Sequence, residues 1–129
     1  MPVTILVVDD DPVIQKLLIV NFEMEGYRVM TASDGIEGLA LVASDRPDLV
    51  LVDVMMPRMD GLEVVRQLRA DAGTATIPVI LLSAKAQSID ISAGIDAGAD
   101  DYVTKPFDPL ELLDKVAGLV GPATPDASA

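Results

Sequence analysis

Two patterns of hydrophobic and polar residues alternate along the chain. Short apolar runs of about four or five residues, closed by charged or turn-forming residues, predict strands that are buried on both faces of a sheet. Longer segments between them carry apolar residues three or four positions apart, which predicts amphipathic helices. The predicted strands are about 3–8, 27–31, 49–53, 79–82 and 101–104. The predicted helices are about 12–25, 34–46, 60–71, 88–97 and 108–120.

The boundaries of these helices carry their own local signals. Aspartates in N-cap positions, followed by proline or by a glutamate three residues later, mark four helix starts: Asp11, Asp34, Asp60 and Asp108. The helix over 88–97 has the weakest signal, because Gly94 lies inside it and an interior glycine costs about 1 kcal/mol relative to alanine. We therefore expect it to be the most mobile of the helices.

The alternation of strand and helix predicts a single α/β domain. Right-handed crossovers between successive strands give a parallel sheet with helices on both faces. For five such units, the leading topology is a flavodoxin-like, doubly wound sheet with strand order 2-1-3-4-5 and five helices. We expect this domain to occupy residues 1–120. Residues 121–129, which are rich in proline and small residues, are predicted to form a flexible tail or the start of a linker.

The composition narrows the range of functions. The 129 residues have a formal net charge of −12, which disfavours direct binding to the phosphate backbone of nucleic acids. The chain has no cysteine and no histidine, so it can form neither thiolate nor histidine metal sites and has no histidine base. It shows neither a signal peptide nor an apolar stretch long enough to span a membrane, so we expect a cytoplasmic protein that does not bind membranes.

Aspartates lie at the ends of two of the predicted strands. Asp9 and Asp10 come directly after the first strand, and Asp53 ends the third. These strands flank the switch point of the predicted topology, where open α/β sheets bind their ligands. Two carboxylates about 4 Å apart repel by about 4 kcal/mol near a protein surface, so the cluster needs raised pKa values or a bound cation. A hard cation with oxygen ligands fits, and Mg²⁺ suits a site that binds phosphate.

The fourth and fifth strands also end in polar residues. Ser83 follows the fourth strand and Lys105 follows the fifth. Taken alone, Ser83 is an ordinary strand-end hydroxyl, Lys105 is a solvated surface lysine, and the aspartates form an acidic turn. Together, the set suits phosphoryl transfer to a carboxylate. Asp53 would be the nucleophile, the other acids would hold Mg²⁺, and the serine and the lysine would contact phosphoryl oxygens.

The motifs around these residues resemble the receiver domain of bacterial two-component response regulators, the CheY-like family. The matching segments are 5–11, 53–57 with 60–61, 82–84, 98–102 and 105–107. As a set these motifs are specific, and the resemblance extends over about residues 3–120. It implies a phosphorylation-activated signalling switch. The phosphoryl donor would be a phosphohistidine on a sensor histidine kinase or a histidine phosphotransfer protein, and the target would be a downstream effector protein.

The resemblance also implies how the phosphoryl group and the metal are bound. Asp53 would be the phospho-acceptor. Asp9, Asp10 and Asp53 would bind Mg²⁺ together with the backbone carbonyl of Met55. The absence of histidine from this chain agrees with a phosphohistidine that is supplied by a partner.

A second group of residues is implied to carry the switch. Ser83 would be the switch hydroxyl, and Lys105 would contact the phosphoryl group. The aromatic side chain of Tyr102 would turn inward and reshape the surface formed by the fourth helix, the fifth strand and the fifth helix. The Lys105–Pro106 peptide is expected to be cis.

Two other functions are left open by the residues. A dehalogenase-like phosphatase also uses an aspartyl nucleophile and Mg²⁺, but its pattern has a second aspartate where this chain has Met55. The other alternative is a receiver-like interaction module that never takes phosphate. A flavin or dinucleotide binder is disfavoured, because no Gly-x-Gly-x-x-Gly follows the first strand. We expect a switch that catalyses only its own phosphorylation and autodephosphorylation, not an enzyme with a separate substrate.

Overall fold

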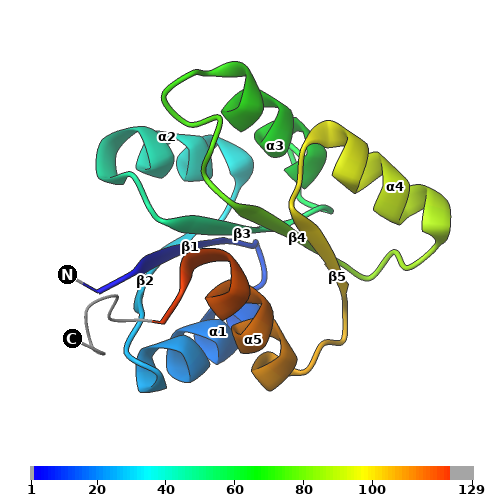
Figure 1. Ribbon diagram of the computed structural model, residues 1–129. Helices are drawn as coiled ribbons and strands as arrows, with labels where there is room; N and C mark the ends of the chain where they lie inside the picture. Colours follow the sequence, from blue (N-terminus) through cyan, green and yellow to red (C-terminus); the bar gives the residue numbers. More distant parts are fainter. Residues whose placement is uncertain (1, 123–129) are drawn as a thin grey trace.

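Strand and helix alternate five times along the chain, as the apolar pattern predicts. The computed structural model of the chain describes residues 2–122 (Figure 1). Its strands are β1 (Thr4–Val8), β2 (Arg28–Ala32), β3 (Leu49–Asp53), β4 (Val79–Ser83) and β5 (Asp101–Thr104). Its helices are α1 (Pro12–Met24), α2 (Gly35–Asp45), α3 (Gly61–Ala70), α4 (Ser88–Ala97) and α5 (Pro109–Val120). Every bound lies within one residue of the predicted one.

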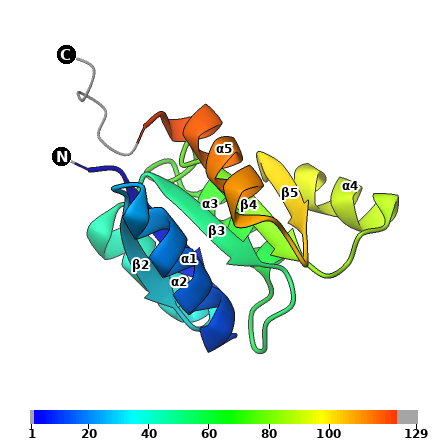
Figure 2. The ribbon, with the colours of Figure 1, turned by 90° about the horizontal axis from the view of Figure 1, so that it is seen from below.

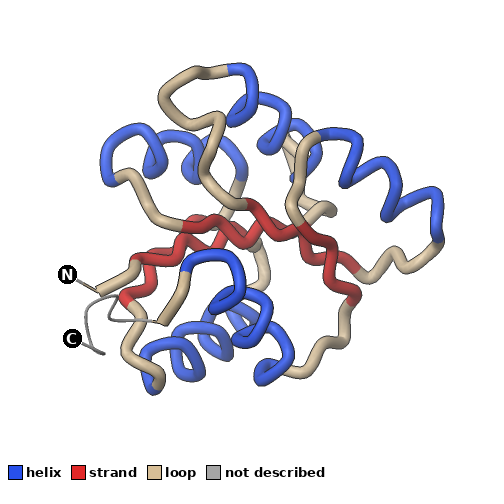
Figure 3. Tube along the Cα trace, viewed as in Figure 1, coloured by secondary structure: helices blue, strands red, loops and turns tan. Residues whose placement is uncertain are grey.

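The strands form one parallel sheet in the order β2-β1-β3-β4-β5. Helices α2, α3 and α4 cover one face of the sheet, and α1 and α5 cover the other (Figure 1). Figure 3 shows the helices as a layer on each side of the strands. Because the strands are parallel, their carboxyl ends meet at one edge of the sheet, toward which the arrows point in Figure 2. The predicted doubly wound fold and its strand order are confirmed.

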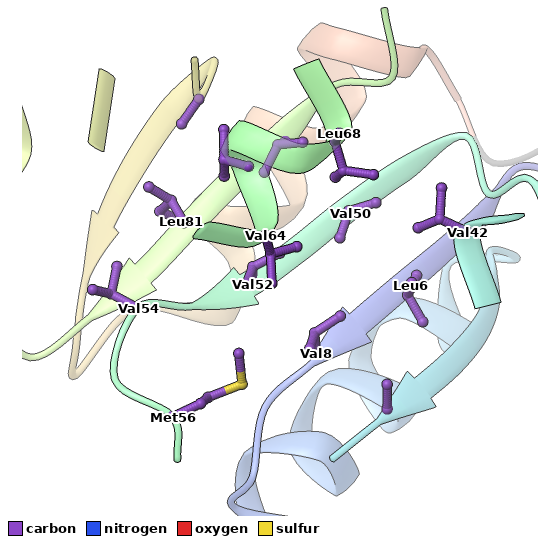
Figure 4. Close-up of a cluster of buried hydrophobic side chains, with 14 of the residues drawn as sticks. Leu6, Val8, Val42, Val50, Val52, Val54, Met56, Val64, Leu68 and Leu81 are labelled. Atoms are coloured by element: carbon purple, nitrogen blue, oxygen red, sulfur yellow. The ribbon is translucent and has the colours of Figure 1, made fainter. Parts of the chain in front are cut away.

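Alternate residues of each strand face opposite helical layers. In β1, Leu6 and Val8 belong to the cluster that includes α2 and α3, whereas Ile5 and Val7 belong to the cluster that includes α1 and α5. Figure 4 shows the first of these clusters, in which strand side chains pack against Val64 of α3. Burying one such aliphatic side chain contributes about 1.5–3 kcal/mol, so the two clusters hold the sheet firmly between its helices.

The end of β3 is packed tightly against the start of α3. The Gly61 amide donates a hydrogen bond to the carbonyl of Val54 (3.0 Å). A Cβ atom on Gly61 would lie 2.5 Å from the carbonyl oxygen of Asp53 and 2.9 Å from the Cα of Val54. Since both neighbours are backbone atoms and cannot move aside as a flexible side chain can, this position requires glycine. The contact holds the backbone of Asp53 in place.

Two expectations about the wider chain can be compared with the described residues. Within residues 2–122, no helix is both long and apolar enough to cross a lipid bilayer. The predicted tail at 121–129 falls mostly on residues 123–129, which lie outside the described part of the chain. The carbonyl of Gly121 accepts a hydrogen bond from the Tyr27 hydroxyl (3.0 Å), which ties the end of α5 to the segment before β2.

Candidate functional site

Three carboxylates meet at the carboxyl ends of β1 and β3. Asp9 and Asp10 follow β1, Asp53 is the last residue of β3, and the two strands are neighbours in the sheet. One carboxylate oxygen from each residue lies within 4.8 Å of the others. Asp9 is fully buried, Asp53 is 6% exposed, and Asp10 is exposed. The acidic cluster expected at the switch point is therefore formed, and it meets solvent at Asp10.

Lys105 reaches this cluster from the end of β5. Its Nζ lies 2.9 Å from Asp9 Oδ2 and 3.6 Å from Asp53 Oδ2, and its side chain is 19% exposed. The peptide between Lys105 and Pro106 is cis, as expected. The Lys105 amide donates to the carbonyl of Ser83 (2.7 Å), which joins the ends of β4 and β5. The lysine is thus held beside the acids and pairs more closely with Asp9 than with Asp53.

Burial and charge within the cluster shift two pKa values. Burial raises the pKa of Asp53, and the charge of Asp9 raises it further, while Lys105 and the Met55 amide lower it in part. Burial by itself would lower the pKa of Lys105, but its hydrogen bond to Asp9 and the charges of Asp9 and Asp53 raise that pKa above its usual value. The lysine keeps its charge, whereas ionised Asp53 is unfavourable unless a further cation is present.

We expect the substitution Asp53→Asn to stabilise the metal-free protein at neutral pH. The pKa of Asp53 is raised above its ordinary 3.8. Between the pKa of the unfolded state and the higher pKa of the folded state, the folded protein therefore binds more protons than the unfolded protein. Stability is lost over that range and stays lost above it, because ionised Asp53 opposes folding. Thermal unfolding in EDTA should show a gain for the variant at neutral pH that disappears at about pH 4. The control is Asp114→Asn, which removes an exposed charge from α5; an equal gain in both variants would contradict the prediction.

Ser83 and Tyr102 are connected through the backbone of Lys85. Ser83 is fully buried, and its Oγ accepts a hydrogen bond from the Lys85 amide (3.0 Å). The Tyr102 hydroxyl donates to the Lys85 carbonyl (2.8 Å), and Tyr102 is 8% exposed. A Cβ atom on Gly94 of α4 would lie 2.8 Å from Cδ2 of the tyrosine ring. The ring therefore lies inward in this structure, and the glycine that weakens α4 in isolation makes room for it. An inward turn of Tyr102 on phosphorylation stays a prediction.

The backbone of Met55 borders the acidic cluster. Its backbone amide donates to Asp53 Oδ1 (3.2 Å), which orients the carboxylate. The side chain is 55% exposed. The role of the Met55 carbonyl as a metal ligand stays a prediction.

A comparison with protein-family models assigns the chain to a family. The model of the response regulator receiver domain matches residues 5–117. The chain belongs to the response regulator receiver family. Receivers of this family take phosphate from sensor kinases and bind Mg²⁺ in an acidic pocket, and this chain has a cluster of three aspartates.

This receiver matches parts of two longer regulators. It is 50% identical over 116 residues to RpaA of Synechocystis sp., a DNA-binding dual master transcriptional regulator, and the match covers 90% of this chain and 48% of RpaA. It is 50% identical over 129 residues to the response regulator MprA of Mycolicibacterium vanbaalenii, covering 100% of this chain and 55% of MprA. The chain spans about half the length of the curated relatives it matches.

Solved structures similar to this receiver include a chemotaxis protein and part of a sensor kinase. CheY4 of Vibrio cholerae has a TM-score of 0.87 and 31% identity, covering 92% of this chain and 99% of that chain. The receiver domain of the sensor histidine kinase PA1611 from Pseudomonas aeruginosa has a TM-score of 0.86 and 33% identity, covering 94% and 99%. Its crystal structure has a magnesium ion coordinated in the active site cleft, so a related receiver has been observed with this metal.

The sequence patterns did not predict two contacts in the segments that follow the strands of this receiver. Gln15 of α1 donates through Nε2 to the carbonyls of Asp9 (2.6 Å) and Ala32 (3.2 Å). Arg58, which follows β3 and has a φ of 68°, pairs at 2.6 Å with Asp34, the N-cap residue of α2. Their acceptors lie on other elements, and no spacing along the chain marks such contacts.

Proposed function

We propose that this receiver is a phosphorylation-activated switch whose phospho-acceptor is Asp53. The observation that carries the proposal is the place of this nearly buried carboxylate at the end of β3, among Asp9, Asp10 and Lys105. A carboxylate oxygen of Asp53 attacks the phosphorus of a phosphohistidine. The P–N bond breaks as the P–O bond forms, and the released imidazole takes a proton. The product is an acyl phosphate on Asp53.

The phosphohistidine comes from a partner protein, because this chain has no histidine. A sensor histidine kinase or a histidine phosphotransfer protein fits, since the family takes phosphate from sensor kinases. We place this exchange in the cytoplasm. The net charge of −12 favours output through a protein effector over direct contact of the receiver with nucleic acid.

The donors of the acidic cluster fit Mg²⁺. They are all oxygens, and one from each carboxylate lies within 4.8 Å of the others, which suits a hard divalent cation. Asp9, Asp10 and Asp53 would hold the ion, with the carbonyl of Met55 as a further ligand. When bound, the ion neutralises charge on the phosphoryl oxygens.

Lys105 and Ser83 act from the ends of the other two strands. Lys105 already lies 3.6 Å from Asp53, and its compact charge contacts a phosphoryl oxygen. The oxygens of the phosphoryl group are new hydrogen-bond acceptors, and they attract the Ser83 hydroxyl. The hydroxyl then moves away from the Lys85 amide, from which its Oγ accepts a hydrogen bond in this structure. Because the Lys85 carbonyl binds Tyr102, this change passes to the surface formed by α4, β5 and α5.

Intact-mass measurement after treatment with acetyl phosphate and Mg²⁺ tests the proposal. The wild-type protein should gain one phosphoryl group, and the variant Asp53→Asn should gain none. No gain in the wild type would contradict the proposal and favour an interaction module that never takes phosphate. Repeated turnover of a phosphomonoester would contradict it in favour of a phosphatase.

We expect Met55→Asn to shorten the lifetime of the acyl phosphate several-fold. The exposed methionine side chain hinders a water molecule that would attack the phosphorus, whereas an amide can bind and orient that water. The loss of the phosphoryl mass with time, after removal of acetyl phosphate, measures autodephosphorylation. Met24→Asn, which replaces an exposed methionine at the end of α1, is the control and should leave the rate unchanged. An unchanged or slower rate in Met55→Asn would count against this account of the lifetime.

A further inference from the structure

The side-chain amide of Gln15 forms hydrogen bonds to the loop that carries Asp9 and Asp10. Gln15 lies half-buried on α1, and its Nε2 is 2.6 Å from the carbonyl oxygen of Asp9 and 3.2 Å from that of Ala32. The backbone ladder between β1 and β2 has its last pair at Val8 and Ala32, and the Asp9 amide adds a bond to Ala32 O (3.0 Å). Gln15 therefore holds the first residue beyond β1 to the end of β2.

Asp9, the residue that Gln15 holds, carries a carboxylate that is repelled by two neighbouring carboxylates. Carboxylate oxygens of Asp9, Asp10 and Asp53 lie within 4.8 Å of one another, so the ionised groups repel. Asp9 is fully buried, and water cannot screen its charge. Lys105 pairs with Asp9 but offsets only one of these charges. The remaining repulsion favours outward movement of the loop that carries Asp9 and Asp10, and such movement would separate the oxygens that must converge on one ion.

We infer that Gln15 is a positioning residue for the Mg²⁺ site. Its amide keeps the backbone of Asp9 in place, and thereby keeps the carboxylates of Asp9 and Asp10 close to Asp53 before the ion binds. This inference rests on the proposed function, because it assigns Mg²⁺ to that same site. Groups that orient metal ligands through hydrogen bonds typically change metal affinity by about 10–100-fold when they are removed.

The inference is tested by comparing two variants of α1. Gln15→Met keeps the length of the side chain and removes all three hydrogen bonds that Nε2 donates, to the carbonyls of Asp9 and Ala32 and, at 3.4 Å, to the Ser33 hydroxyl. Asn21→Leu is the matched control: Asn21 is also half-buried, and its amide donates to a carbonyl of the same helix, that of Leu17 (2.8 Å), away from the acids. Isothermal titration calorimetry measures the Mg²⁺ dissociation constant of each protein, and thermal unfolding in EDTA measures its stability.

Gln15→Met should raise the Mg²⁺ dissociation constant about tenfold, and Asn21→Leu should leave it unchanged even if both lose stability. With acetyl phosphate, the Mg²⁺ concentration for half-maximal labelling of Gln15→Met should rise by the same factor, while the rate at saturating Mg²⁺ stays near that of the wild type. A dissociation constant equal to the wild-type value would overturn the inference, because Gln15 would then only stabilise the fold.

Three further outcomes are distinguished by the same experiment. If Gln15→Met does not fold, Gln15→Asn retains an amide on a shorter side chain and should show weakened Mg²⁺ binding; wild-type affinity in that variant would overturn the inference. Calorimetry needs no phosphoryl transfer, so a wild-type protein that binds Mg²⁺ but takes no phosphate would contradict the proposed function and still allow Gln15 to be judged. A wild-type protein that does not bind Mg²⁺ would overturn both.

Discussion

Removal of Mg²⁺ should slow the phosphorylation of Asp53 by about 100-fold or more. The incoming phosphoryl group is negatively charged, and it approaches a cluster in which Asp9 and Asp10 repel it. Lys105 supplies a single positive charge, and that charge is already paired with Asp9 at 2.9 Å. A divalent ion is the additional source of positive charge that a cluster of carboxylate oxygens binds best.

The rate of labelling is measured from intact mass against time, with acetyl phosphate in the presence of either Mg²⁺ or EDTA. A thermal unfolding curve in EDTA is the control, because it shows that the metal-free protein is folded at the temperature of the assay. Equal rates in Mg²⁺ and EDTA would contradict the assignment of the acidic cluster as a metal site.

The substitution Lys105→Met should destabilise the metal-free protein by about 3 kcal/mol. The lysine is 19% exposed and pairs with the fully buried Asp9, so its loss leaves buried carboxylates without a counter-charge. Breaking such a pair is costly because the remaining charge stays in a poorly solvated place. Added Mg²⁺ should restore most of the lost stability, since the ion supplies positive charge to the same acids.

Lys115→Met is the matched control for this prediction. Lys115 Nζ also lies 2.9 Å from an aspartate oxygen, that of Asp101, but the two side chains are 44% and 37% exposed. Exposed pairs of this kind contribute less than about 1 kcal/mol. Urea unfolding of both variants in EDTA and in Mg²⁺ measures the free energies. Equal losses in the two variants, or a loss at Lys105 that Mg²⁺ does not reduce, would contradict the prediction.

The strands and their terminal residues could be predicted because burial leaves a clear pattern. β3 and β4 are buried at every position, and their polar residues, Asp53 and Ser83, are the last of each strand. Parallel strands end at one edge of the sheet, so the pattern that predicts the strands also brings their terminal residues together. The convergence of the acids with Lys105 follows from this rule, whereas the strand order follows from the doubly wound topology that is typical of five such units.

Contacts between elements could not be predicted in the same way. The flexible side chain of Lys105 can reach several acids, and only the structure shows that it pairs most closely with Asp9. An interior glycine indicates a weak helix, whereas Gly94 is the place where α4 packs against the ring of Tyr102. Gln15 resembles any polar residue in a helix, yet its amide joins two strand ends. In each case the contacted residue lies on another element of the fold. The periodicity of a single segment does not predict contacts between elements.

Reduction of the phosphorylated protein with borohydride tests the central claim most directly. Borohydride converts an acyl phosphate to an alcohol and leaves free carboxylates unchanged, so it marks the acceptor residue. We predict reduction at Asp53, detected in the peptide that contains it, after treatment with acetyl phosphate and Mg²⁺. Reduction at Asp9 or Asp10, or no reduction in protein that has gained the phosphoryl mass, would contradict the account.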